Sequence, residues 1–240
     1  LKAADKVIVT NRRIKEKLIN NYKFLTFDEV YIISHGYDAE DFINIGQLQK
    51  PNDKMIITYA GLFYEYITPK YFLQAFKRLL IENSSIAENI RLSFVGLLGK
   101  ENQKYIRDLK LESYITEYGY LDHQETIQKL MMSDILWIMV GNGKSAETIS
   151  SGKLYEYFGT SKPIIACLTD GALKMAAAEY KASFITEPDN VQQIKNAILE
   201  TYNLFKAGKL PIPDEKFIEG FRRDLLTEQL ALQLNKVLKV

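Results

Sequence analysis

The strongest constraint on the fold is an alternation of two hydrophobic patterns between Met55 and Phe205. Short continuous apolar runs indicate buried strands, and longer segments with an apolar residue every three or four positions indicate helices. This alternation predicts an α/β protein with a Rossmann-like, doubly wound parallel sheet that has helices on both faces. We expect strands at Met55–Ala60, Ile90–Val95, Tyr114–Tyr118, Ile135–Val140, Ile164–Leu168 and Ser183–Thr186. Helices are expected at Pro69–Glu82, Lys100–Leu109, Asp122–Met132 and Ala172–Tyr180, and from a cap at Asp189 to Phe205.

Shorter elements flank this core. Before it we expect a strand at Val7–Thr10, a helix at Asn11–Asn21, a strand at Val30–Ser34 and a polar linker at Gln47–Lys54. After it, Leu210–Asp214 contains two prolines and is expected to be a rigid connector. One long terminal helix is predicted beyond it, because apolar residues recur with helical spacing at Phe217, Phe221, Leu225, Leu230, Leu234 and Val237.

Composition excludes several classes of protein. The 240 residues carry 31 basic and 30 acidic side chains, a net charge of +1, so we expect no nucleic-acid partner. The single cysteine, Cys167, rules out an internal disulfide and is expected to be a core residue. No apolar run approaches the roughly 20 residues that span a bilayer, and charges near the start interrupt any signal-peptide core. We therefore expect a cytoplasmic protein, with peripheral contact to the inner membrane face left open.

A candidate ligand site lies between Ser150 and Ala166. Ser150, Ser151 and Gly152 precede a short amphipathic helix, and the free backbone donors and dipole of a helix start favour a phosphate anion. Lys153, in the first turn, adds a positive charge. A loop, a helix and a strand this close together are typical of a ligand crevice in an α/β sheet.

Residues 152–164, GKLYEYFGTSKPI, resemble the retaining glycosyltransferases of family 4, which have the two-domain GT-B architecture. The resemblance implies that Glu156 holds the ribose hydroxyls of a nucleoside-diphosphate sugar. It also implies that backbone groups of Ser151, Gly152, Lys153 and Leu154 meet the diphosphate. The substrate would then be the nucleotide sugar itself, with no cofactor and no metal. The alternative is that Glu156 is a solvated helix residue, as most glutamates are.

The resemblance also suggests a division of the chain into three parts. Residues 1–50 would be the tail of an N-terminal acceptor-binding domain and the hinge, with His35 where the family has Asn. Residues 51–209 would form the donor-binding domain, and residues 210–240 a helix that crosses back to the first domain. The first residue is not Met and the chain opens in the middle of a pattern. We therefore expect a fragment of a longer protein that lacks most of its N-terminal domain.

Several further residues are assigned by the resemblance. Gly61 would lie beside the donor diphosphate, but the Arg and Lys that the family places after it fall on Leu62 and Ile67. Lys153, helped by Lys144, would then have to balance the phosphates. The alternative for Gly61 is a plain turn at the end of a strand.

Two loops complete the predicted site. Gly119, Tyr120 and Leu121 would lie near the base, with Tyr120 as an ordinary half-buried aromatic as the alternative. The first glutamate of the family's pair falls on Thr148, next to Glu147, and these two residues are the candidates for contact with the donor sugar. For Glu147, a solvated loop carboxylate is the alternative.

These features predict the donor-binding part of a retaining glycosyltransferase of the hexosyltransferase type. It would transfer a sugar from a nucleoside diphosphate to a sugar or lipid-linked acceptor, in polysaccharide or glycoconjugate biosynthesis, and this fragment alone would be inactive. Because Leu62 and Ile67 lack charge, a non-catalytic nucleotide-sugar or protein-binding module remains an alternative, as does a nucleotide-sugar epimerase of the same architecture. A nicotinamide dehydrogenase is disfavoured, since no Gly-x-Gly-x-x-Gly motif follows a strand.

Overall fold

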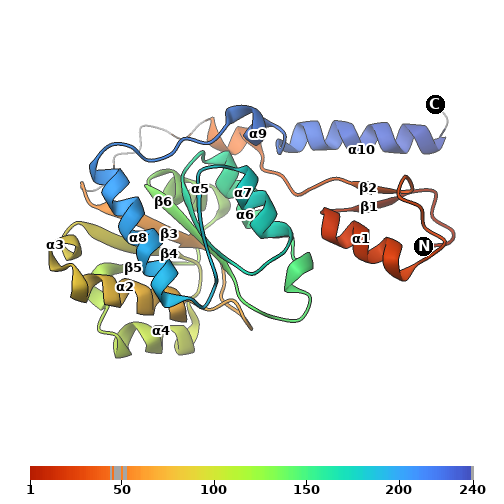
Figure 1. Ribbon diagram of the computed structural model, residues 1–240. Coiled ribbons are helices and arrows are strands. Elements are labelled where there is room, and N and C mark those ends of the chain that lie inside the picture. Colours follow the sequence, from red (N-terminus) through yellow and green to blue (C-terminus); the bar gives the residue numbers. More distant parts are fainter. Residues whose placement is uncertain (44, 46–49, 51–52, 239–240) are drawn as a thin grey trace.

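The computed structural model, which describes residues 1–43, 45, 50 and 53–238, is built around a six-stranded sheet (Figure 1). All neighbouring strands in it are parallel, and their order is β5-β4-β3-β6-β7-β8. The strands are β3 (Met55–Ala60), β4 (Ile90–Val95), β5 (Ile115–Gly119), β6 (Ile135–Val140), β7 (Ile164–Leu168) and β8 (Ser183–Thr186). The predicted α/β class and doubly wound sheet are confirmed. The strand order reverses between β3 and β6, the place where ligands bind in sheets of this type.

Helices cover both faces of the sheet and create two hydrophobic cores. One core lies under α2 (Lys70–Glu82), α3 (Ser84–Ala87), α4 (Gly99–Asp108) and α8 (Val191–Lys206). The other lies under α5 (His123–Met131), α6 (Gly152–Gly159) and α7 (Ala172–Glu179). Strand residues alternate between the two cores, so Trp137 and Cys167 pack in the first and Leu136 and Ala166 in the second. The short 3-10 turns are η1 (Ala39–Phe42), η2 (Glu112–Tyr114) and η3 (Ala146–Thr148).

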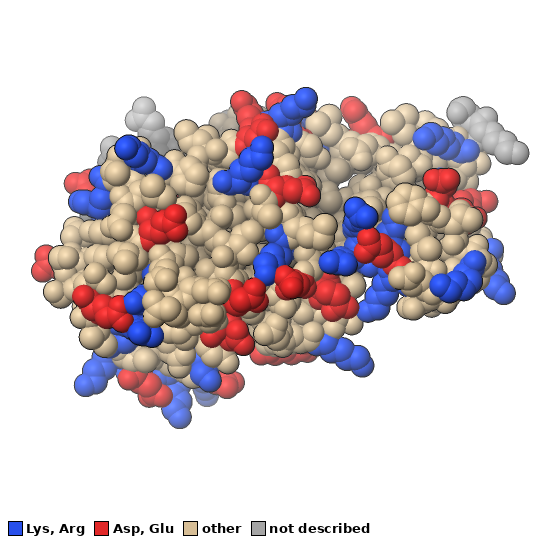
Figure 2. Space-filling view, viewed as in Figure 1, with Lys and Arg blue, Asp and Glu red and all other residues tan. Residues whose placement is uncertain are grey.

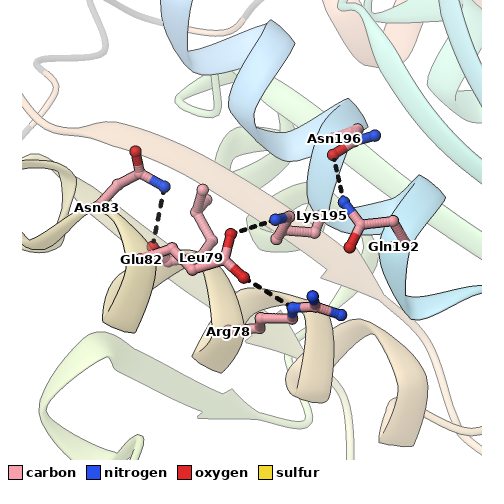
Figure 3. Close-up of polar contacts among 7 residues, drawn as sticks. All are labelled: Arg78, Leu79, Glu82, Asn83, Gln192, Lys195 and Asn196. Atoms are coloured by element: carbon pink, nitrogen blue, oxygen red, sulfur yellow. Dashed lines mark hydrogen bonds and ion pairs between the residues drawn. The ribbon is translucent and has the colours of Figure 1, made fainter.

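Side-chain contacts join α2 to α8 on the outside of the first core (Figure 3). Glu82 of α2 accepts from Arg78 on its own helix at 2.7 Å and pairs with Lys195 of α8, a residue only 8% exposed. The prediction that Asp189 caps α8 is wrong. Asn190 is the cap, because it directly precedes Val191, the first residue of α8. Its side chain accepts from the backbone N–H of Gln193 at 3.0 Å.

A small separate unit precedes the large sheet. It consists of β1 (Val7–Val9), α1 (Arg12–Asn21) and β2 (Val30–Ile32), with the two strands parallel and Val9, Leu25 and Val30 at its core. Asn11, at the start of α1, donates through Nδ2 to the carbonyl of Thr148 at 3.0 Å. This contact ties the small unit to the loop that precedes α6.

The predicted single terminal helix is wrong, because the structure has two helices, α9 (Glu215–Glu219) and α10 (Arg223–Leu238). The backbone between them pairs with Tyr37: the Tyr37 N–H donates to the carbonyl of Phe221 at 3.0 Å, and the Arg223 N–H donates to the carbonyl of Tyr37 at 2.9 Å. Because the Phe221 carbonyl and the Arg223 N–H bond Tyr37, they do not take part in the backbone hydrogen bonds of one continuous helix. In Figure 1, α10 extends away from the large sheet along the small unit.

The surface provides two further observations. Acidic and basic side chains are interspersed over the face shown in Figure 2, in line with the balanced composition. Among the described residues, none of the helices combines the length and the apolar character needed to cross a bilayer.

Candidate functional site

A cleft of about 480 Å³ opens at the carboxyl ends of β3 and β4, close to the point where the strand order reverses. Its walls come from the loops after β3, β4 and β5 and from the first turns of α5 and α6. Residues predicted for the ribose, the diphosphate and the base meet in it, since its lining is Ala60, Gly61, Leu62, Val95, Gly96, Leu97, Tyr120, Leu121, Thr126, Lys153 and Glu156. Gly61, Tyr120, Leu121, Lys153 and Glu156, which are distant in sequence, are therefore neighbours in the fold.

Bare backbone forms the floor of this cleft. The N–H of Gly61 donates to the carbonyl of Val95 at 2.8 Å, and that of Gly96 donates to the carbonyl of Gly119 at 2.7 Å. Gly61 and Gly96 have φ angles of +126° and +117°, and a Cβ on Gly96 would collide with the carbonyl oxygen of Gly61. Glycine at both positions thus lets a ligand approach the main chain closely.

Lys153 projects from the first turn of α6 over the end of β3. Its ammonium lies 3.9 Å from the centre of the Tyr59 ring, and a Cβ on Gly61 would be 2.5 Å from its Nζ. Within the part of the chain that the structure describes, Nζ has no ion pair or hydrogen bond. Burial lowers the pKa of Lys153 to about 7, an effect only partly opposed by the carboxylate of Glu156. A bound anion would restore the charged form.

Glu156 is half-buried one turn further along α6, next to the cleft. Burial raises the pKa of its carboxyl, while His123 and Arg223 act in the opposite direction. It also borders a second hollow of about 250 Å³, formed by the loop after β2, the start of α6 and the first turns of α10. Glu156 therefore lies between two open spaces, and its carboxylate is available to a ligand in either of them.

Sequence reasoning did not foresee the polar residues that surround Glu156. Asp41 of η1 bonds Nε2 of His123 at 2.7 Å and accepts from Gln124 Nε2 at 3.0 Å, and the bond to His123 raises the pKa of that imidazole. Arg223 donates to the carbonyl of Gly36 at 3.2 Å. Only tertiary contacts bring these residues to Glu156, so the sequence contains no periodicity or spacing that would have revealed them.

Other predicted residues lie elsewhere. Glu147 and Thr148 do not line the cleft: Glu147 is exposed with its carboxylate 3.8 Å from Lys17, and the carbonyl of Thr148 accepts from Asn11. Lys144 is exposed on the same loop and does not line the cleft either. Their predicted role at the donor sugar and its phosphates stays a prediction.

The remaining predicted positions differ in what they offer the cleft. Leu62 is 53% exposed at its edge, whereas Ile67 is 8% exposed and packs in the first core, where a lysine would bury its charge. Ser151 precedes the first residue of α6, Gly152 borders the second hollow, and the side chain of Leu154 is fully buried. Only main-chain groups of Leu154 are therefore available to a ligand.

Solved structures with the same fold include several glycosyltransferases. A glycosyltransferase from Rickettsia africae matches 98% of this chain over 64% of its own length, with 18% identity and a TM-score of 0.73. The pneumococcal O-GlcNAc transferase GtfA, in complex with UDP and GlcNAc, matches 98% of the chain over 46% of its own, at 18% identity and a TM-score of 0.68. Anabaena HepE, in complex with UDP and glucose, matches 97% over 63%, at 17% identity and a TM-score of 0.66.

The chain therefore spans less than two thirds of each of these structures. Its six-stranded parallel sheet corresponds to part of the GT-B glycosyltransferases. No curated protein matches the sequence. The family model described as glycosyl transferases group 1 matches residues 41–206, more than half of the chain and the whole of the large sheet. The chain therefore belongs to the glycosyl transferases group 1 family.

Proposed function

We propose that the cleft binds a nucleoside-diphosphate sugar, with UDP as the nucleotide, and that the chain is the donor-binding part of a retaining glycosyltransferase. The observation that carries this proposal is the ammonium of Lys153. It has no ion-pair partner among the described residues and lies between Gly61 and the start of α6, where a diphosphate would be held. The complexes of GtfA and HepE with UDP support the choice of nucleotide.

In this proposal each part of the cleft meets one part of the donor. The diphosphate contacts the backbone of Gly61, Ser151, Gly152 and Leu154 and the ammonium of Lys153. Glu156 accepts from the ribose hydroxyls, and the loop of Gly119, Tyr120 and Leu121 holds the base. Tyr120 is 82% exposed, which leaves its ring free to cover a bound base.

The chemistry asks little of the protein beyond stabilising charge. As the bond between the sugar and the diphosphate breaks, negative charge grows on the leaving diphosphate. In this proposal, Lys153 and the N-terminal backbone donors of α6 stabilise that charge. We propose that the acceptor is bound by the N-terminal domain, of which residues 1–50 would be the tail and hinge. We therefore expect residues 51–209 to bind the donor and transfer to require that domain.

Calorimetric titration of the 240-residue chain with the diphosphates of uridine, guanosine and adenosine tests the proposal. We expect saturable binding of UDP and a loss of at least about tenfold in affinity in Glu156→Ala, since a charged hydrogen bond contributes about 1.5–3 kcal/mol. Glu200→Ala, on the outer helix α8, is the matched control and should bind as the unaltered chain does. Equal affinity in Glu156→Ala and the control would refute the ribose role of Glu156.

A second candidate function is a non-catalytic nucleotide-sugar binding module. The observation in its favour is the core position of Ile67, which leaves no cation where the family has a lysine. Such a module would bind UDP yet never transfer or hydrolyse the sugar when joined to an acceptor-binding domain. Release of UDP from UDP-sugars by the longer protein would exclude it.

A further inference from the structure

Strands β3 and β6 are neighbours where the strand order reverses, close to the cleft, but they pair over a short stretch only. Strand β3 is in register with β4 over its whole length, from Met55 opposite Ile90 to Ala60 opposite Val95. Its register with β6 covers only Ile57 and Thr58. Beyond Thr58 the last two residues of β3 therefore have no strand partner on the β6 side.

A tyrosine from α6 occupies this gap. The hydroxyl of Tyr157 accepts the backbone N–H of Ala60 at 2.9 Å, and the Tyr157 side chain is completely buried. Successive N–H groups of a strand point to opposite edges, and the next one, that of Gly61, donates to Val95 on the β4 side. The Ala60 N–H thus faces the gap, where Tyr157 takes the place of a β6 carbonyl.

This bond joins the two elements, β3 and α6, whose residues Gly61 and Lys153 would hold a diphosphate. Ala60 immediately precedes Gly61, and Tyr157 lies one helical turn after Lys153 and directly after Glu156. The hydrogen bond thus joins β3, which forms one wall of the cleft, to α6, which forms another. It is buried, so water does not compete for the Ala60 N–H.

We propose that Tyr157 is a positioning residue for donor binding: by accepting the Ala60 N–H, its hydroxyl sets the spacing between Gly61 and the first turn of α6. The inference rests on the proposed function, because the spacing matters only to a ligand that contacts both walls. Tyr157 itself touches no ligand. Phenylalanine at this position would keep the packing and leave the Ala60 N–H buried without its partner.

Tyr157→Phe tests the inference, with Tyr180→Phe as the matched control. Tyr180 packs in the same core, and its hydroxyl also bonds a backbone group, donating to the carbonyl of Lys162 at 2.9 Å, away from the cleft. Both variants should lose some thermal stability. Only Tyr157→Phe should lose affinity for UDP, by about tenfold, while Tyr180→Phe stays within about twofold of the unaltered chain.

An NMR titration separates positioning from general loosening of the core. In the unaltered chain, UDP should shift the Gly61 amide and the Lys153 side-chain resonances together. In Tyr157→Phe, UDP should shift the resonance of only one of these two residues, because the ligand no longer contacts both walls. Joint shifts in Tyr157→Phe, or an equal loss of UDP affinity in Tyr180→Phe, would overturn the inference and leave the proposed function intact.

A measurement on the unaltered chain covers the case in which Tyr157→Phe does not fold. UDP that bridges the two walls should slow hydrogen exchange of the Ala60 amide, and unchanged exchange at saturating UDP would contradict the inference. Absence of UDP binding to the unaltered chain would overturn the proposed function and the inference together.

Discussion

Two lysines of this chain differ in their partners: Lys195, in the outer helix layer, has a carboxylate partner, and Lys153, in the cleft, has none among the described residues. Lys195 is 8% exposed and pairs with Glu82, which also bonds Arg78 (Figure 3). Among the described residues, the ammonium of Lys153 has no ion pair or hydrogen bond and lies over the Tyr59 ring beside Gly61, and burial lowers its pKa to about 7. A paired buried charge holds two helices together, whereas an unpaired one costs stability and is retained where a ligand supplies the missing counter-charge.

Replacing each lysine with methionine should separate these two roles, and we expect this to be the largest effect. Lys153→Met should lower UDP affinity about 10- to 100-fold, because a charged hydrogen bond to the diphosphate is lost. The same change should raise the melting temperature, since a desolvated ammonium is removed. Lys195→Met should do the reverse, with lower thermal stability and unchanged UDP affinity. Calorimetry and thermal unfolding of both variants measure the two quantities.

Binding of UDP should take up a proton, because free Lys153, with a pKa of about 7, is only partly charged at neutral pH. The diphosphate raises that pKa, so affinity falls as pH rises above 7, by about tenfold between about pH 7 and 8.5. Titrations in buffers of different ionisation enthalpy measure the proton uptake. If UDP binding takes up no proton, or still takes one up in Lys153→Met, another group pairs with the diphosphate.

The same shift has a defined effect on stability. The folded-state pKa of Lys153, about 7, lies below its unfolded value of 10.5, so between these two pH values the unfolded chain binds more protons at this residue. The contribution of Lys153 to the free energy of unfolding therefore rises with pH across this window. Thermal unfolding should show that the gain from Lys153→Met shrinks as pH increases.

Gly61→Ala should have the smallest effect of these changes on binding. A Cβ there would lie 2.5 Å from Nζ and 2.8 Å from Cε of Lys153, and the φ of +126° strains any other residue. A flexible lysine can move, so we expect a loss of affinity of about 1 kcal/mol, or about fivefold, and a stability cost of about 1–3 kcal/mol.

Gly99→Ala is the control for this change, because Gly99 also has a positive φ, +73°, and a Cβ added there would meet nothing within 4 Å among the described residues. It should cost stability through the backbone alone and leave UDP affinity unchanged. Equal affinity for UDP in both variants would show that the space beside Lys153 is not used by the ligand.

Local pattern was sufficient for much of the fold. Most of the strands predicted for the large sheet, among them Ile135–Val140 and Ile164–Leu168, have the same bounds in the structure. A buried parallel strand is a continuous apolar run, so its ends are marked in the sequence. The start of α6 was equally clear, since Gly152 follows two serines and precedes an amphipathic turn.

Pattern failed where a partner distant in sequence decides the outcome. The repeat from Phe217 to Val237 predicts one helix, but backbone bonds from Tyr37 divide it into α9 and α10. The carboxylate of Glu147 lies 3.8 Å from Lys17 of the small unit, a neighbour that the sequence does not reveal, and its predicted role at the donor sugar stays a prediction. The positions of Arg223 and Asp41 near Glu156 were not predicted from the sequence.

The sequence by itself determined the alternation of strands and helices and the chemical groups at each strand end, because hydrophobic periodicity and glycine are local properties. Only the tertiary structure decided which of those groups share a cleft and which charges are left without partners. Lys153 shows the reason, because its pKa depends on burial against Tyr59 and Gly61, which come from a distant part of the chain. Burial and distance exist only once strands and helices from separate parts of the chain have packed together.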